Sequence, residues 1–127
     1  MNMDTEDMLE IYQLLARYTL LADVKRDHEA MRRIFTSDGS FNVPAIDLFA
    51  SGIENIVAFF RDREGGDHHI NTNIVIDAES DSAVVNSYVH IIKAEQGVKS
   101  LVFGRYEDEL LKTEQGWRIK VRTVVLY

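Results

Sequence analysis

Apolar residues recur at steps of three and four in the first quarter of the chain, and they alternate with polar residues in the second half. The first helical stripe consists of Met8, Ile11, Leu15, Tyr18 and Ala22. This spacing places the stripe on one face of a helix, which we expect to run from about residue 5 to residue 25. Asp4 and Thr5 are suited to cap its start, because a side-chain oxygen there can accept a free backbone N–H group.

Two shorter helices are predicted before the middle of the chain. In order, the predicted elements are a helix over about 28–35, a turn over 36–40, a short strand over 41–43 and a helix over about 52–62. Asp27 is placed to cap the first of these helices. Ser51 and Glu54 have the spacing of a capping box at the start of the second.

From His68 onward the pattern changes to alternation, which is typical of strands with one buried face. We expect four strands, over residues 68–77, 83–94, 99–112 and 117–126. Turn signals separate them at Glu79-Ser80-Asp81, Glu95-Gln96-Gly97 and Thr113-Glu114-Gln115-Gly116. Three helices followed by four antiparallel strands indicate an α+β fold. A curved sheet with the helices packed on one face would form a cone whose open end is a pocket.

The composition narrows the class of protein. A length of 127 residues suits a single domain over residues 1–127, and the absence of cysteine excludes disulfide bonds and thiolate zinc sites. A net charge of -7 argues against nucleic acid, because phosphate contacts need a basic surface. No apolar stretch approaches the ~20 residues of a membrane helix, and the acidic N-terminus is unlike a secretory signal. We therefore expect a cytoplasmic protein that binds neither nucleic acid nor membrane.

Two adjacent histidines, His68 and His69, begin the first long strand directly after Gly65-Gly66. Adjacent strand residues point to opposite faces of a sheet, so both rings cannot bind one metal ion, and no third ligand is suitably spaced. We predict no metal site. Asn71 and Asn73 share the parity of His69 and are expected to face the same side. The alternative for both asparagines is a buried amide that pairs with the first helix.

Several short motifs occur together in a specific order. They are Tyr18, Asp23, Asp27, Phe35, Gly52, Phe59-Phe60, His69-Ile70-Asn71-Thr72-Asn73, Gly104-Arg105-Tyr106-Glu107-Asp108, Gly116-Trp117-Arg118-Ile119 and Arg122. In this order the chain resembles the NTF2-like superfamily, and within it the SnoaL-like group that includes scytalone dehydratase. The resemblance covers nearly the whole chain. It is specific for the fold and less specific for catalysis, since many members have no known activity.

The resemblance implies a general base and a partner for it. In dehydratase-like members a histidine of this strand removes a proton and an aspartate at the end of the first helix orients it, and His69 and Asp23 occupy these places. Imidazole can accept a proton at neutral pH, and a carboxylate on its other ring nitrogen fixes the tautomer. The step from Asp23 to Asp27 is four residues where relatives often have three, so Asp27 is the alternative partner. The resemblance implies no cofactor. It does imply a homodimer that forms through the outer face of the sheet.

Further residues are candidates for binding a substrate, namely Tyr18, Asn71, Asn73, Tyr106, His90, Phe35 and Phe60. Tyr18 lies five residues before Asp23, which is not the same face of an α-helix, although its hydroxyl is suited to orient a substrate oxygen. His90 shares a strand face with Tyr88, and either lines the pocket or belongs to a dimer face. Candidates for the apolar wall of the pocket are Phe35, Phe49, Phe60 and Phe103.

The last two strands carry residues whose expected role is structural. Asp108, which shares a strand face with Tyr106, is expected to form an ion pair with Arg122 across the sheet. An alternating apolar set, expected to form one face of the core or of a subunit interface, consists of Trp117, Ile119, Val121 and Val125.

These observations favour a cofactor-independent lyase or isomerase. It would act on a small hydrophobic, cyclic molecule by dehydration, elimination or isomerisation. The alternative is a non-catalytic module of the same fold that binds a small ligand or dimerises, and a third possibility is a small subunit of a ring-hydroxylating oxygenase. The ketosteroid-isomerase branch of the superfamily uses a catalytic aspartate as base, with a tyrosine and a neutral acid that bind the oxyanion. Its tyrosine matches Tyr18, but its base position falls near Val43 and its neutral-acid position near Tyr106. Two of the three roles are therefore missing, and we exclude that mechanism. Hydrogen-bond contact between Asp23 and His69 would favour catalysis over the non-catalytic alternative.

Overall fold

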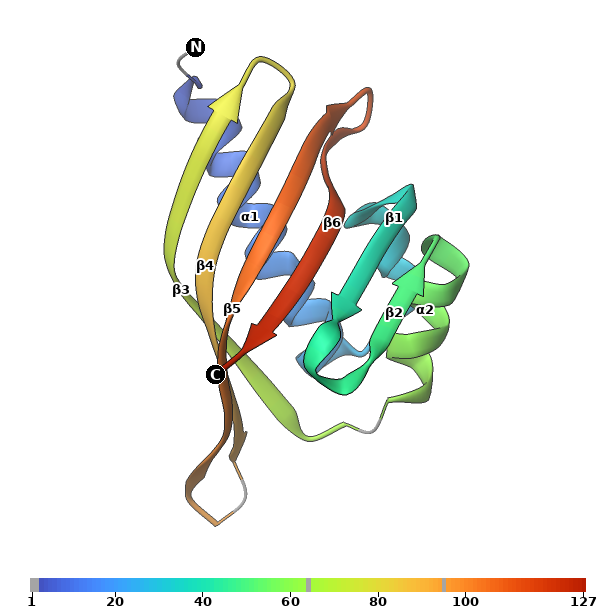
Figure 1. The fold of residues 1–127 in the computed structure, drawn as a ribbon, viewed down its shortest axis with the longest axis vertical. Helices are drawn as coiled ribbons and strands as arrows, with labels where there is room; N and C mark the ends of the chain where they lie inside the picture. Colours follow the sequence, from blue (N-terminus) through green and yellow to red (C-terminus); the bar gives the residue numbers. More distant parts are fainter. Residues whose placement is uncertain (1–2, 64, 95) are drawn as a thin grey trace.

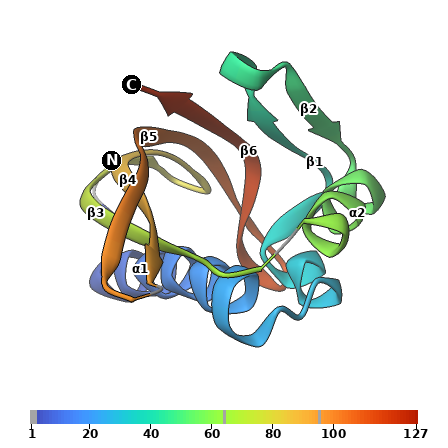
Figure 2. The same cartoon turned by 90° about the horizontal axis from the view of Figure 1, so that it is seen from below.

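The computed structural model describes residues 3–63, 65–94 and 96–127, and six strands in it form one sheet. The strands are β1 (Phe35–Val43), β2 (Leu48–Ser51), β3 (Asp67–Glu79), β4 (Ser82–Ala94), β5 (Val98–Thr113) and β6 (Gly116–Leu126). Their spatial order is β2-β1-β6-β5-β4-β3, and all neighbours are antiparallel except β1 and β6, which are parallel. The sheet is curved, and the hairpin of β4 and β5 extends beyond its neighbours (Figures 1 and 2). The predicted turn at residues 95–97 includes Glu95, which lies outside the described residues.

The helical segments are shorter and more varied than the sequence predicts. They are α1 (Thr5–Thr19), the π-helix η1 (Leu20–Lys25), the 3-10 helices η2 (Glu29–Arg33) and η3 (Pro44–Ile46), and α2 (Ile53–Asp62). α1 crosses one face of the long strands, and α2 lies beside β1 and β2 (Figure 1). The prediction of three helices is therefore wrong, since the described residues contain two α-helices.

The predicted helix over residues 28–35 is a 3-10 helix of five residues, and Phe35 is already the first residue of β1. Asp27 Oδ1 accepts the N–H of Ala30 at 3.2 Å, so the predicted cap is present. The N–H of Ile119 in β6 donates to the carbonyl of Ile34 at 2.8 Å. This pairing with β6 takes the chain into the sheet before another helical turn can form. The predicted turn over residues 36–40 consequently lies inside β1, at an irregularity of its register.

The strand β2 is absent from the sequence prediction because its four residues are too few to show an alternation. Ser51 is the last residue of this strand, and Gly52, with φ 83°, is the N-cap of α2. No side chain caps that helix, so the predicted capping box between Ser51 and Glu54 is wrong. The predicted end of the helix at Asp62 is confirmed.

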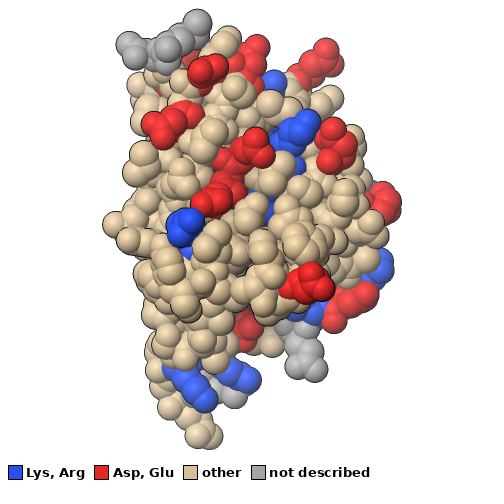
Figure 3. Space-filling model, in the orientation of Figure 1, with Lys and Arg blue, Asp and Glu red and all other residues tan. Residues whose placement is uncertain are grey.

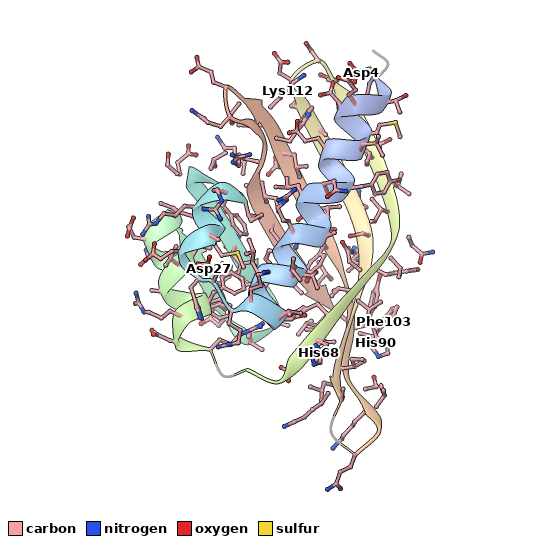
Figure 4. The ribbon with its side chains drawn as sticks, turned by 180° about the vertical axis from the view of Figure 1, so that it is seen from behind. Asp4, Asp27, His68, His90, Phe103 and Lys112 are labelled. Carbon is pink, nitrogen blue, oxygen red and sulfur yellow. The ribbon has the colours of Figure 1, made fainter. Side chains whose placement is uncertain are left out.

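Acidic side chains fix the first turns of α1 to the sheet. Asp4 caps the helix by accepting the N–H of Asp7 at 2.8 Å. Asp7 Oδ1 accepts the indole N–H of Trp117 at 2.9 Å and lies 2.9 Å from Nζ of Lys112. Asp4 and Lys112 accordingly lie at the same end of the molecule in Figure 4. The buried face of α1, formed by Ile11, Leu14, Leu15 and Tyr18, leads from this anchor to the other end of the helix.

One irregularity between β5 and β6 changes which side chains face the core. The register shifts where Glu109 pairs with Val121 and Leu110 pairs with Ile119, which leaves Lys120 as an extra residue. Trp117 and Ile119 are fully buried before this bulge, whereas Arg122 and Val124 take the inner positions after it. The prediction that residues 117, 119, 121 and 125 share one face is therefore wrong beyond the bulge.

Candidate active site

A π-helical turn at the end of α1 brings Asp23 to the inside of the molecule. In an α-helix, residues five apart differ in direction by about 140°, whereas a π-helix is built from i→i+5 hydrogen bonds and is common at functional sites. Tyr18 and Asp23 are consequently both buried, with 1% and 9% of their surfaces exposed. The expectation that they face different ways is wrong because it assumes an α-helix throughout.

Asp23 and His69 are in direct contact. Oδ1 of Asp23 lies 2.8 Å from Nδ1 of His69, and Oδ2 accepts the backbone N–H of the same histidine. The two side chains are 1% and 5% exposed. The contact that the resemblance implies is present, while the catalytic role of the pair stays a prediction. Asp27 caps η2 and lies among the helical segments, away from His68, in Figure 4.

Asp23 is held as a carboxylate, which in turn sets the tautomer of the histidine. Burial alone would raise the pKa of Asp23, but the hydrogen bonds from His69, with the positive charges of Arg63 and of His69 in its protonated form, outweigh burial and lower it. A carboxylate on Nδ1 requires the proton of the neutral ring to sit there, so we assign the lone pair to Nε2. No described residue is hydrogen-bonded to Nε2. The ring therefore keeps one basic nitrogen free.

His69 lines a pocket of about 240 Å³ between the inner face of the sheet, η3 and α2. Its lining is Tyr18, Phe41, Val43, Ile46, Leu48, Phe59, Arg63, His69, Ile91, Val102, Tyr106, Val124 and Leu126. Small-molecule sites are typically apolar with a few placed polar groups, and this lining has that character. A larger hollow of about 430 Å³ lies near the turn between β3 and β4, but acids and a lysine line it and no histidine does.

Arg122 and Asp108 form the ion pair that the sequence predicts, and it is fully buried. Arg122 Nε donates to Asp108 Oδ1 at 2.8 Å and Nη2 donates to Oδ2 at 2.9 Å. The guanidinium carbon lies 3.7 Å from the ring centre of Tyr106 and 4.3 Å from that of Tyr18. The guanidinium of Arg122 thus packs against two tyrosines that line the pocket, although Arg122 itself does not line it.

Burial of Tyr18 and Tyr106 should lower the free energy of unfolding at high pH. Burial raises the pKa of Tyr18 and, more strongly, that of Tyr106, although the charge of Arg122 opposes both shifts. Above the ordinary tyrosine pKa of about 10, the unfolded chain releases protons that the folded chain keeps, so the free energy of unfolding falls as pH rises. Each retained proton contributes a slope of about 1.4 kcal/mol per pH unit. Urea unfolding between about pH 10 and 11 should show a shallower decline for Tyr106→Phe than for the wild type. Equal slopes would contradict this assignment.

Asn73 and Asn71 are predicted binding residues that the structure places outside the pocket lining. The register of β3 shifts between Thr72 and Val75, and Asn73 adopts φ 55° there. This bulge breaks the alternation on which the prediction rests and leaves Asn73 exposed. The amide of Asn71 donates to Ser87 Oγ and to the carbonyl of Tyr88, both at 2.8 Å. Asn71 therefore ties β3 to β4, and does not pair with the first helix.

His90 also lies outside the pocket lining, on the opposite face of the sheet. Its Nε2 is 2.8 Å from Ser100 Oγ, and its ring lies 5.9 Å from that of Phe103, beside it in Figure 4. His68 is exposed and His69 is buried, so the two rings lie on opposite faces as predicted. Of the predicted binding residues, Tyr18 and Tyr106 do line the pocket.

The predicted phenylalanine wall is only partly correct. Phe35 and Phe60 are buried and contact the edge or face of Tyr18 at centroid distances of 6.2 and 5.7 Å, so they support the pocket without lining it. Phe49 and Phe103 are 62% and 44% exposed and do not belong to it. Phe41 and Phe59 supply the wall instead. Phe59 could have been found from its pairing with Phe60 in the motif; Phe41 carries no such signal.

Arg63 is the pocket residue that sequence reasoning missed most completely, because a charged residue directly after a helix is usually solvated. Its Nη2 lies 3.5 Å from Asp23 Oδ1, and its side chain is 22% exposed. Within the described ranges, no group of three or more histidine, aspartate or glutamate side chains is arranged to hold a metal ion. Nor is any described helix both long and apolar enough to cross a membrane.

The curved six-stranded sheet, the crossing helix and the pocket between them define an α+β protein of the cystatin-like, NTF2-like fold. The chain belongs to the SnoaL-like family, since the model of the SnoaL-like domain matches residues 3–123. Among curated proteins, none is significantly similar to the chain.

Solved structures with this fold confirm the resemblance. An NTF2-like protein with a cystatin-like fold from Novosphingobium aromaticivorans is 27% identical, with a TM-score of 0.86 over 95% of this chain and 82% of that one. A candidate scytalone dehydratase from the same organism is 24% identical, with a TM-score of 0.79 over 94% and 83% of the two chains. ActVI-ORFA from Streptomyces coelicolor is 19% identical, with a TM-score of 0.83 over 96% and 98%. The last two likenesses are evidence for the fold.

Proposed function

We propose that the protein is a cofactor-independent lyase or isomerase in which His69 removes a proton from carbon. The observation that carries this proposal is the 2.8 Å contact between Asp23 and Nδ1 of His69 beside an apolar pocket. In the proposed step the C–H proton moves to Nε2, and the electron pair stays on the substrate as an enolate or expels a leaving group. Asp23 stabilises the imidazolium that forms and acts as a positioning residue.

The proposed substrate is a small, largely apolar ring compound. The pocket of about 240 Å³ is below the roughly 300–1,000 Å³ of drug-sized sites, so it suits a molecule of one or two rings. Family membership and the structural likeness to a candidate scytalone dehydratase support chemistry of the dehydration, elimination or isomerisation type.

Proton exchange tests this proposal without knowledge of the natural substrate. A panel of cyclic ketones, such as 2-tetralone and 2-indanone, is incubated with the protein in D₂O, and the loss of the α-proton signal is followed by NMR. Acceleration over buffer is expected for at least one ketone. If none is accelerated and the ketones nevertheless bind, the non-catalytic ligand-binding alternative replaces this proposal.

We further propose a homodimer through the outer face of β3 to β6. Exposed aromatic side chains gather there, with Tyr88, Phe103 and Tyr127 being 40%, 44% and 70% exposed. The rings of Phe103 and Tyr127 stack at 5.8 Å. In Figure 3, which looks onto this side of the sheet, the region over the middle of β3 and β4 carries few charged side chains. A surface of this kind suits association with an identical surface.

Glutamate at position 103 is expected to dissociate that dimer. An unpaired carboxylate in a buried interface is costly, so Phe103→Glu should raise the dimer dissociation constant at least about 100-fold. Sedimentation velocity across protein concentrations measures the change. Phe49→Glu is the matched control, since Phe49 is 62% exposed on β2, at the opposite edge of the sheet from β3 and β4. A wild-type monomer, or an equal effect of both variants, would contradict the proposed interface.

A further inference from the structure

Arg63 is the one cationic side chain that lines the pocket in the described part of the chain. It follows the last residue of α2, and its guanidinium carbon lies 5.7 Å from the ring centre of Phe60. Among the described residues, Asp23 is the carboxylate within ion-pair distance, with Oδ1 3.5 Å from Nη2 of Arg63. A positive charge therefore stands in an otherwise apolar wall, next to the His69–Asp23 pair.

The guanidinium keeps donors free for a ligand. In an N–H···O hydrogen bond the nitrogen and oxygen normally lie roughly 2.7–3.2 Å apart. The 3.5 Å contact between Arg63 and Asp23 is therefore an ion pair without a hydrogen bond. No described residue accepts a hydrogen bond from the Arg63 side chain. Arginine presents up to five N–H donors in a planar fork that matches a carboxylate or an enolate oxygen. Among the residues that the structure describes, none uses the hydrogen-bond donors of Arg63.

Asp23 does not need Arg63 to stay in place. Both its oxygens accept hydrogen bonds from His69, one from the ring and one from the backbone. Its side chain is 1% exposed, whereas that of Arg63 is 22% exposed. A ligand in the pocket consequently meets the guanidinium of Arg63, while the carboxylate of Asp23 is covered.

The backbone of Arg63 is fixed as well. Its carbonyl accepts a hydrogen bond from Nη2 of Arg26 at 2.6 Å. The side chain of Arg26 in turn packs against Gly65, where an added Cβ would lie 3.3 Å from it. The start of the connection between α2 and β3 is therefore held against the end of η1, with Arg63 turned to the pocket.

We propose that Arg63 is a binding site for a negatively charged substrate oxygen, so that the substrates are apolar ring compounds bearing a carboxylate or an enolisable carbonyl. This inference rests on the proposed function. As His69 Nε2 takes the C–H proton, the electron pair moves onto the carbonyl oxygen, and the enolate formed is neutralised by Arg63. The site then holds two new charges, the imidazolium beside Asp23 and the enolate beside Arg63, and each has an opposite partner.

A matched pair of probes tests the site. Isothermal titration calorimetry at pH 7 compares 2-naphthoate with 2-naphthamide, which has nearly the same shape and no charge. The wild type should bind the carboxylate at least about tenfold more tightly, because a hydrogen bond to a charged group is worth more than one to a neutral group. Arg63→Met should lose this preference while still binding the amide. Arg61→Met, two residues earlier on an exposed face, should retain it.

Several results would overturn the proposal. They are equal wild-type affinity for both probes, no naphthoate binding at millimolar concentration, or a preference that survives in Arg63→Met. If Arg63→Met does not fold, as judged by circular dichroism, Arg63→Gln replaces it with the same expectation. Measuring the preference in His69→Gln separates this inference from the proposed function. If the protein prefers naphthoate but catalyses no proton exchange, the anion site is supported and the proposed catalysis is not. If exchange depends on His69 but naphthoate is not preferred, the catalysis is supported and the anion site is not.

Discussion

Glutamine in place of His69 should slow enzyme-catalysed α-proton exchange of a responsive cyclic ketone by about 10²–10⁴-fold, the usual contribution of a general base. Glutamine keeps a hydrogen-bonding amide near Asp23 but cannot accept a proton at neutral pH. NMR-monitored exchange in D₂O measures the effect directly. Asp23→Asn should also slow exchange, because an amide does not stabilise the imidazolium that forms on proton transfer.

His68→Gln is the matched control for this prediction. It makes the same substitution one residue earlier, on an exposed side chain outside the pocket lining. Its exchange rate should equal that of the wild type. An equal loss in both variants, or no loss in His69→Gln, would mean that the proton is removed elsewhere.

Asparagine in place of Asp108 should lower the free energy of unfolding by about 3–5 kcal/mol, because it leaves the buried charge of Arg122 without its partner. Both side chains of this pair are 0% exposed. Nη1 of Arg122 is also the only buried side-chain nitrogen or oxygen, among the residues that the structure describes, without a hydrogen-bond partner. Few other groups around Arg122 can therefore compensate for the lost carboxylate. Urea denaturation at neutral pH measures the change.

Glu107→Gln is the control for the buried pair. Glu107 neighbours Asp108 in β5 and pairs with Arg105 at 2.8 Å on the outer face, with 46% and 36% of the two side chains exposed. Exposed ion pairs typically contribute less than about 1 kcal/mol, so this variant should stay close to the wild type. A cost below about 1 kcal/mol for Asp108→Asn would show that Arg122 tolerates the loss of its carboxylate.

The sequence predicted the contact between Asp23 and His69 through a resemblance, and simple alternation separated buried His69 from exposed His68. The ion pair of Asp108 and Arg122 was predictable for the same reason, since both lie on inward positions of neighbouring strands. These predictions succeed because they depend on local periodicity and on matched strand positions.

The errors arise where one inserted residue changes the direction of those that follow. The π-turn of η1 rotates Asp23 toward Tyr18, and the bulge in β3 turns Asn73 out of the pocket. Neither irregularity has a signal in the hydrophobic pattern. Arg63 illustrates the same limit, since a charged residue after a helix is usually solvated and only the fold brings this one to the pocket.

The proposed proton transfer requires a free Nε2 on His69, and the protonation of that ring decides whether Nε2 is available. Long-range ¹H–¹⁵N correlation NMR, with the signals of His69 assigned through their loss in His69→Gln, distinguishes the two tautomers of the neutral imidazole. We expect the proton on Nδ1, bound to Asp23, and a bare Nε2 that faces the pocket. In Asp23→Asn this preference should weaken. A wild-type ring protonated on Nε2, with Nδ1 bare, would contradict the account, because His69 would then have no free base to offer a substrate.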